Sequence, residues 1–129
     1  EAGLDPDALF ASWAETGGHR ASCASVASGA ADVAAIDCVT WGLLGKHAPR
    51  EVEALRALGW TPPAPSLPYV TTASRSDAEV AALRDALAGA LADPALAGPR
   101  AALLLDGAEI LPDAAYDRAL ELEALAASR

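Results

Sequence analysis

Clusters of apolar residues in the first third of the chain are separated by turn residues and predict short alternating elements. Residues 9–15 are expected to form a short strand that carries Phe10 and Trp13. Helical spacing follows over residues 19–28, and Gly29 is a natural helix stop. Residues 32–36 form a compact apolar segment typical of a buried strand. This order predicts a βαβ unit with two parallel strands.

The next elements are bounded by capping and breaking residues. Asp37 is placed to cap a helix that runs to about residue 47, before Pro49 ends it. A second helical piece is expected over residues 50–55, with another strand over residues 58–61. The first eight residues, which include Pro6, are expected to be a helix end or turn.

The middle of the chain is rich in proline. Residues 62–68 (PPAPSLP) are incompatible with a helix or a central strand. We therefore expect a stiff crossover here, followed by an extended segment over residues 69–73.

The last part of the chain has helical periodicity. Ser76 and Glu79 have the spacing of a capping box, which predicts a helix start. Asp93-Pro94 ends that helix, a shorter helix follows to about residue 105, and residues 107–112 are an extended link. A closing helix is expected from Asp113. Residues that mark the helical faces are Val80, Leu83, Leu87, Leu91, Tyr116, Ala119, Leu122 and Ala126.

Composition narrows the choice of partners. The 129 residues are 53% hydrophobic and 21% charged, which is typical of a globular chain. The net charge of −9 argues against nucleic acid and against an acidic membrane surface. A small anion is still compatible, because a local group of N–H donors can outweigh the global charge. The sequence contains no apolar run of about 20 residues and no signal peptide, and we expect a processed chain or part of a longer protein.

The main candidate for chemistry is the turn that precedes the first predicted helix. It contains Thr16, Gly17, Gly18 and His19, and Ser22 lies one turn further along. Helix N-termini leave N–H groups unpaired, and glycines let a ligand approach the backbone. His19 and Ser22 add side-chain donors at the same helix end. These residues predict an anion site; the competing interpretation is a plain turn with an exposed histidine.

Asp37 strengthens the anion-site hypothesis. It ends the second predicted strand, as the glycine–histidine turn ends the first, and open α/β sheets bind ligands at that carboxyl edge. Its carboxylate could accept a proton from a protonated oxyanion or orient His19. N-capping of the following helix is an equally reasonable role.

The cysteines and tryptophans allow alternative interpretations. Cys38 with His19 and Asp37 is conceivable as a nucleophilic set, and Cys23 with Cys38 as a disulfide, although an apolar core role is favoured for both. Trp41 and Trp60 are expected in the core, with a cleft wall as the alternative. The sequence contains no metal-ligand spacing and no cofactor-binding loop, so we expect neither a metal nor a cofactor.

Residues 16–41 (TGGHRASCASVASGAADVAAIDCVTW) resemble the phosphate/phosphite/phosphonate-type periplasmic solute-binding proteins of ABC importers. The likeness continues through WTPPAPSLPYVTT at residues 60–72. It implies an α/β fold of the type II periplasmic-binding kind, in which two lobes joined by a hinge close around the ligand. Residues 1–61 would be the second-lobe βαβ region, residues 62–73 the hinge or crossover, and residues 74–129 a C-terminal helical region that returns to the first lobe.

The resemblance also implies a site and partners. His19 matches the histidine that contacts the oxyanion, Thr16, Gly18 and Ser22 match its turn, and Asp37 lies at the cleft-facing strand end. A membrane permease would be the partner, the location would be periplasmic, and the protein would not be an enzyme. Such proteins are about twice this length, so the first lobe is expected to be missing from this sequence. Leu67 stands where amine-binding members often carry an acid, which weakens the case for an amine-bearing ligand.

Two other classes of function stay open from the sequence. One is a small α/β enzyme that uses Cys38 or His19. The other is a sensor domain built from a binding-protein lobe.

Overall fold

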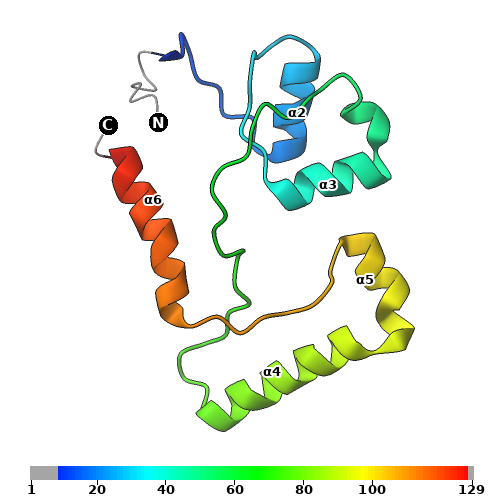
Figure 1. The fold of residues 1–129 in the computed structure, drawn as a ribbon, viewed down its shortest axis with the longest axis vertical. Coiled ribbons are helices and arrows are strands. Elements are labelled where there is room, and N and C mark those ends of the chain that lie inside the picture. The colour runs from blue at the N-terminus through cyan, green and yellow to red at the C-terminus, as the bar shows by residue number, and fades with distance from the viewer. Residues whose placement is uncertain (1–8, 128–129) are drawn as a thin grey trace. The chain divides into compact units, whose positions relative to one another are not determined.

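A computed structural model describes residues 9–127 of the chain, so the turn or helix end expected over residues 1–8 lies outside the described residues. Contacts divide the chain into two compact units, Glu1–Thr61 and Pro62–Arg129. Figure 1 shows the helices of both units.

The predicted strands are absent from the described residues. The segments 9–15, 32–36 and 58–61 contain no strand, and the segment 69–73, expected to be extended, forms no strand either. A strand needs ladder hydrogen bonds to a neighbouring strand, whereas the backbone bonds recorded outside the helices are those of turns and helix ends. The parallel βαβ unit is therefore not formed here, and the α/β class is not confirmed.

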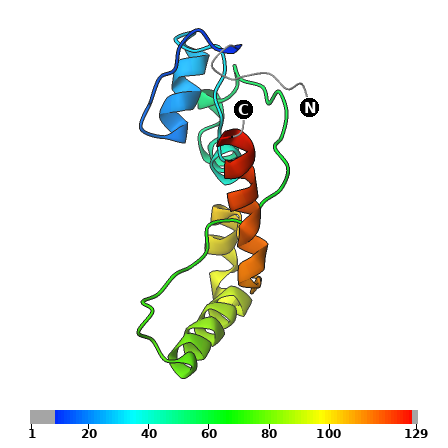
Figure 2. The same ribbon diagram turned by 90° about the vertical axis from the view of Figure 1, so that its left-hand side faces the viewer.

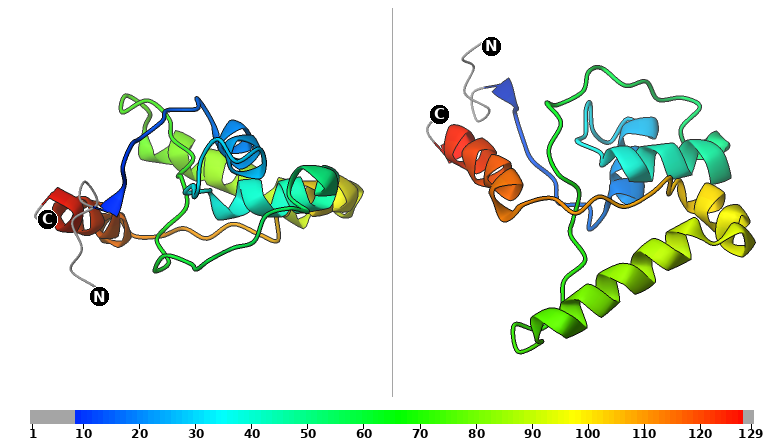
Figure 3. Two further views of the ribbon diagram at one scale, coloured as in Figure 1. Left: turned by 90° about the horizontal axis from the view of Figure 1, so that it is seen from above. Right: turned by 60° about the horizontal axis from the view of Figure 1, so that its bottom comes forward.

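The first unit is built on two short helices, α2 (His19–Ala27) and α3 (Cys38–His47), and on the 3-10 turn η1 (Pro49–Glu51). These three elements contact one another, and Figure 3 shows α2 and α3 close together. The prediction of a helix over residues 50–55 is wrong, because η1 is the only helical turn that forms there. So short a stretch cannot offset the cost of helix nucleation.

Both helices of the first unit begin and end close to the predicted positions. Asp37 is the N-cap of α3, and its carboxylate accepts a hydrogen bond from the Thr40 N–H at 2.7 Å. After α2, Gly29 adopts a φ of 75°, a left-handed conformation that glycine reaches without a Cβ penalty. The Ala30 N–H then bonds back to the Ser25 carbonyl at 2.9 Å. Local capping signals thus set these helix ends.

Over residues 62–127, the second unit contains three helices and two 3-10 turns. They are α4 (Asp77–Ala92), η2 (Pro94–Leu96), α5 (Ala97–Leu103), η3 (Asp113–Tyr116) and α6 (Asp117–Ala127). The predicted capping box is confirmed, because the Ser76 hydroxyl accepts from the Glu79 N–H and the Glu79 carboxylate accepts from the Ser76 N–H. The closing helix is preceded by η3, so its regular part begins at Asp117 rather than Asp113.

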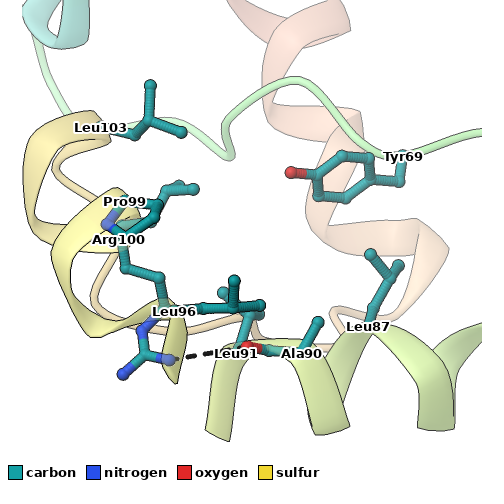
Figure 4. A pocket seen from close by; sticks show the side chains of 9 residues that line it. Tyr69, Leu87, Ala90, Leu91, Leu96, Pro99, Arg100 and Leu103 are labelled. Atoms are coloured by element: carbon teal, nitrogen blue, oxygen red, sulfur yellow. Dashed lines mark hydrogen bonds between the residues drawn. The ribbon is translucent and has the colours of Figure 1, made fainter. Parts of the chain in front are cut away.

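A tight turn joins α4 to α5, and Figure 2 shows α5 at the end of α4. Arg100 of α5 donates to the Asp93 carbonyl at 2.7 Å and to the Ala90 carbonyl at 3.5 Å. An apolar pocket of about 210 Å³ lies beside this turn (Figure 4). Its lining residues are Tyr69, Leu87, Ala90, Leu91, Leu96, Pro99, Arg100, Leu103 and Leu105. Because this lining is apolar apart from Tyr69 and Arg100, and Nη1 of Arg100 already donates to two carbonyls, the pocket is a poor candidate for anion binding.

Few apolar side chains are buried in the part of the chain that the structure describes. The buried ones are Cys23 and Leu44, at 2% and 8% exposure. Trp60 is 69% exposed, so the expectation that it lies in the core is wrong, whereas Trp41 is half-buried. Trp60 lies within the segment 58–61, which forms no strand and so offers it no packed sheet face.

The Leu44 side chain is buried in the first unit, so its packing should contribute to stability. Leu44→Ala is expected to lower the free energy of unfolding by about 2–3 kcal/mol, because it removes buried methyl groups and leaves a cavity. Leu58→Ala is the control: its side chain is 71% exposed, and its effect is expected to stay within about 0.5 kcal/mol. Urea denaturation followed by tryptophan fluorescence measures both. Equal effects of the two substitutions would contradict this packing.

Candidate functional site

The candidate site begins with a sharp turn before α2. Gly17 has a φ of 81°, whereas Gly18 has a φ of 170° and is extended. A Cβ added at either glycine would meet no atom within 4 Å. Gly18 is the N-cap of α2, and no side chain caps this helix end. By contrast, Asp37 caps α3 and Ser76 caps α4. The first N–H groups of α2 therefore form an uncapped, electropositive helix start.

Two hydroxyl groups meet on the flank of this turn. The Thr16 Oγ1 and Ser22 Oγ atoms lie 2.6 Å apart, and either can be the donor. Thr16 Oγ1 also lies 3.2 Å from the Gly18 carbonyl oxygen, to which it can donate. Each hydroxyl has one hydrogen to give. When Thr16 donates to Ser22, the Ser22 hydrogen is free to point toward a ligand.

His19, the first residue of α2, lies next to Asp37 at the start of α3. The Asp37 N–H donates to His19 Nδ1 with an N···N distance of 3.4 Å. Hydrogen bonds from Thr40 hold the pKa of the Asp37 carboxyl below its usual range. The Asp37 side chain is therefore ionised at neutral pH, and one of its carboxylate oxygens accepts a hydrogen bond from α3.

All six residues predicted for the site thus lie in one connected group. Thr16, Gly17, Gly18, His19 and Ser22 are neighbours in sequence, whereas Asp37 is 18 positions from His19. The parallel strands that motivated their proximity are absent from the described residues, and the contact between two helix starts brings them together instead. Their roles in ligand binding stay predictions.

One interaction beside the site was not predicted. Arg20 follows His19, and its Nε and Nη2 atoms donate to the two carboxylate oxygens of Glu51, the former at 2.6 Å. This bidentate pair ties α2 to η1. The two residues are 31 positions apart with no shared motif, so sequence patterns gave no signal for their contact. Arg20 is consequently engaged with Glu51 rather than oriented as a ligand cation.

The two cysteines occupy different environments. Both are free thiols, Cys23 buried and Cys38 exposed, so no disulfide joins them. Burial raises the pKa of the Cys23 thiol, and the nearby Glu51 charge raises it further. Cys23 is therefore a core residue, as the favoured interpretation held, whereas the core role expected for Cys38 is wrong. Among the bonds recorded for residues 9–127, none joins Cys38 to His19.

The described part of the chain carries neither a metal centre nor a membrane span. No group of three or more His, Cys, Asp or Glu side chains is arranged to hold a metal ion among residues 9–127. No helix within that range combines the length and hydrophobicity needed to cross a bilayer.

Comparison with known protein families identifies the class of protein to which this chain belongs. The family described as "ABC transporter, phosphonate, periplasmic substrate-binding protein" matches residues 1–116. Proteins of this class bind a solute for transport and are generally not enzymes. The chain belongs to the phosphonate-type periplasmic substrate-binding proteins of ABC transporters. Its family implies an extracytoplasmic location and a type II periplasmic-binding fold. Searches of curated proteins and of solved structures gave no significant match.

The Arg20–Glu51 pair makes a prediction about pH. Hydrogen bonds from Arg20 lower the pKa of the Glu51 carboxyl, and its charge lowers it further. A carboxyl whose pKa is lower in the folded state stabilises the fold above its unfolded pKa and loses that effect as pH falls through its folded pKa. The difference in unfolding free energy between wild type and Arg20→Gln should therefore be constant near neutral pH and shrink in acid.

Urea denaturation at a series of pH values measures this difference. The matched control is the same substitution in a Glu51→Gln background, where the pH dependence of the difference should vanish. A difference that stays constant down to a pH well below the ordinary Glu pKa of 4.5 would contradict the pairing.

Proposed function

We propose that this chain supplies one wall of the binding site for a small phosphorus oxyanion, either phosphate, phosphite or a phosphonate, in the solute-binding component of an ABC importer. The observation that carries the proposal is the uncapped start of α2, with His19, Ser22 and two glycines around it. Unpaired N–H groups at a helix start attract anions, and the family is one of phosphonate-binding proteins.

The donors available at this end match the chemistry of a phosphorus oxyanion. The first N–H groups of α2 donate from the backbone, His19 from its ring and Ser22 from its hydroxyl. The net charge of −9 works against anion capture at long range, so affinity has to come from these short contacts. Because Arg20 is engaged with Glu51, the anion would be held mainly by neutral or partly charged donors.

Asp37 gives the proposed site a preference among anions. Its backbone N–H contacts His19, and its ionised carboxylate, which accepts from Thr40, would repel a fully deprotonated oxyanion nearby but could accept a hydrogen bond from a protonated one. Phosphate, phosphite and methylphosphonate carry such a proton in part of their population near neutral pH, whereas sulfate does not. We therefore expect sulfate to bind more weakly than the phosphorus oxyanions.

In this proposal the ligand is trapped between two lobes. A complementary first lobe would supply the opposite wall of the site. Residues 62–73 would serve as the hinge or crossover, with residues 74–129 returning to the first lobe. The loaded protein would then dock on its permease and be associated with the membrane through it.

Isothermal titration of the full-length natural protein with phosphate, phosphite, methylphosphonate and sulfate tests the proposal. His19→Ala is expected to weaken the tightest ligand about tenfold or more, because a hydrogen bond to a charged group contributes about 1.5–3 kcal/mol. His47→Ala is the control, since His47 ends α3 and lies outside the proposed set, and its affinity should not change. Absence of heat with all three phosphorus oxyanions, or equal affinity in His19→Ala, would refute the proposal.

The two glycines allow backbone strain to be separated from ligand approach. Gly17→Ala is expected to lower the free energy of unfolding by about 1–2 kcal/mol, because alanine is strained at a positive φ. Gly18→Ala should leave stability unchanged, because its backbone is extended and its surroundings are open. Its Cβ would instead obstruct an anion that approaches the start of α2.

Stability and affinity measured on both variants separate backbone strain from obstruction of the ligand. We expect Gly18→Ala to weaken oxyanion binding about tenfold or more, the equivalent of one charge-assisted hydrogen bond. Thermal denaturation and titration of the same samples provide the comparison. Unchanged affinity in Gly18→Ala would mean that the ligand does not contact this turn.

A further inference from the structure

The contact between Asp37 and His19 determines which ring nitrogen of His19 carries the proton. A backbone N–H can only donate, and the Asp37 N–H points at His19 Nδ1 over 3.4 Å. An imidazole nitrogen accepts a hydrogen bond only through a bare lone pair. In this arrangement the neutral ring therefore has a bare Nδ1 and a hydrogen on Nε2.

Asp37 can make this contact because its main chain and side chain have separate roles. Its carboxylate is turned to α3, where it accepts the Thr40 N–H at 2.7 Å. As an N-cap it lies just outside the helix, and its own N–H is not part of the first intrahelical hydrogen bonds. The backbone has a φ of −60° and a ψ of 135°, so the N–H faces away from α3 and reaches the histidine.

This tautomer matters for a site that binds an anion. With Nε2 protonated, a neutral His19 presents a donor at the ring nitrogen that the Asp37 N–H does not contact. With Nδ1 protonated, it would present a lone pair, which repels an oxyanion. The Asp37 N–H therefore selects the ring form that can bind an anion without the ring having to become charged.

We propose that Asp37 is a positioning residue, whose backbone N–H holds His19 in the Nε2–H tautomer and directs that hydrogen toward the bound oxyanion. The inference rests on the proposed function for the identity of the ligand. The tautomer itself is a property of the ligand-free protein, so it can be tested separately.

Two substitutions at residue 37 isolate the N–H from the carboxylate. Asp37→Ala removes the carboxylate that caps α3 and keeps the N–H. Asp37→Pro removes both, and the φ of −60° at this position is the one that proline adopts. Both variants lose the carboxylate that caps α3. They differ in the backbone N–H of residue 37, which only Asp37→Ala keeps.

The measurement is nitrogen NMR of the ¹⁵N-labelled full-length protein without ligand, at mildly alkaline pH where an imidazole is neutral. A protonated ring nitrogen and a bare one have well-separated shifts, and the His19 signals are assigned by their loss in His19→Gln. We expect the Nε2–H form to dominate in wild type and in Asp37→Ala, and a mixture of tautomers in Asp37→Pro. A relaxation to roughly equal populations would also weaken oxyanion binding about twofold relative to Asp37→Ala, because half the molecules would present the donor.

The possible outcomes separate the two proposals. A wild-type spectrum with Nδ1 protonated, or with mixed tautomers, overturns the inference even if Asp37→Pro does not fold. The same tautomer population in Asp37→Ala and Asp37→Pro also overturns it. A single Nε2–H form that responds to Asp37→Pro, in a protein that binds none of the phosphorus oxyanions, would support the inference and refute the proposed function.

Discussion

The positive φ of Gly17 is the constraint on which the candidate site depends. A φ of 81° is accessible to glycine but strained for a residue with a Cβ, and it turns the chain just before α2 begins. After that turn the hydroxyls of Thr16 and Ser22 meet, and the helix starts at His19 without a side-chain cap. An ordinary residue at position 17 would disfavour the backbone conformation that brings these groups together.

Two helix starts that meet, rather than a sheet edge, bring the residues of the candidate site together. Sequence patterns predicted that Asp37 and His19 would lie near each other because both followed predicted strands. The described residues contain no strands, yet the two residues are neighbours, since Asp37 caps α3 where α3 adjoins α2. The proximity was therefore predicted, but the geometry that achieves it differs from the expected one.

Local signals accounted for most of what could be predicted from the sequence. The cap at Asp37, the capping box at Ser76 and the stop at Gly29 depend on residues within a few positions, and each helix end follows them. Strands depend on partners distant in sequence, and their backbone groups find none among the described residues. The Arg20–Glu51 pair also spans 31 positions, and no pattern marked it in advance.

The proline-rich segment has a consequence for the solubility of the chain. Residues 62–68 include Leu67 and are followed by Tyr69 and Val70, and these three are among the most exposed apolar side chains of the second unit. An exposed apolar stretch with free backbone donors can pair edge-to-edge with another molecule and begin aggregation. Prolines lack the N–H that such pairing requires, and Pro65 and Pro68 interrupt the run of donors beside these side chains. Proline at these positions therefore disfavours pairing of this exposed apolar segment with the backbone of another molecule.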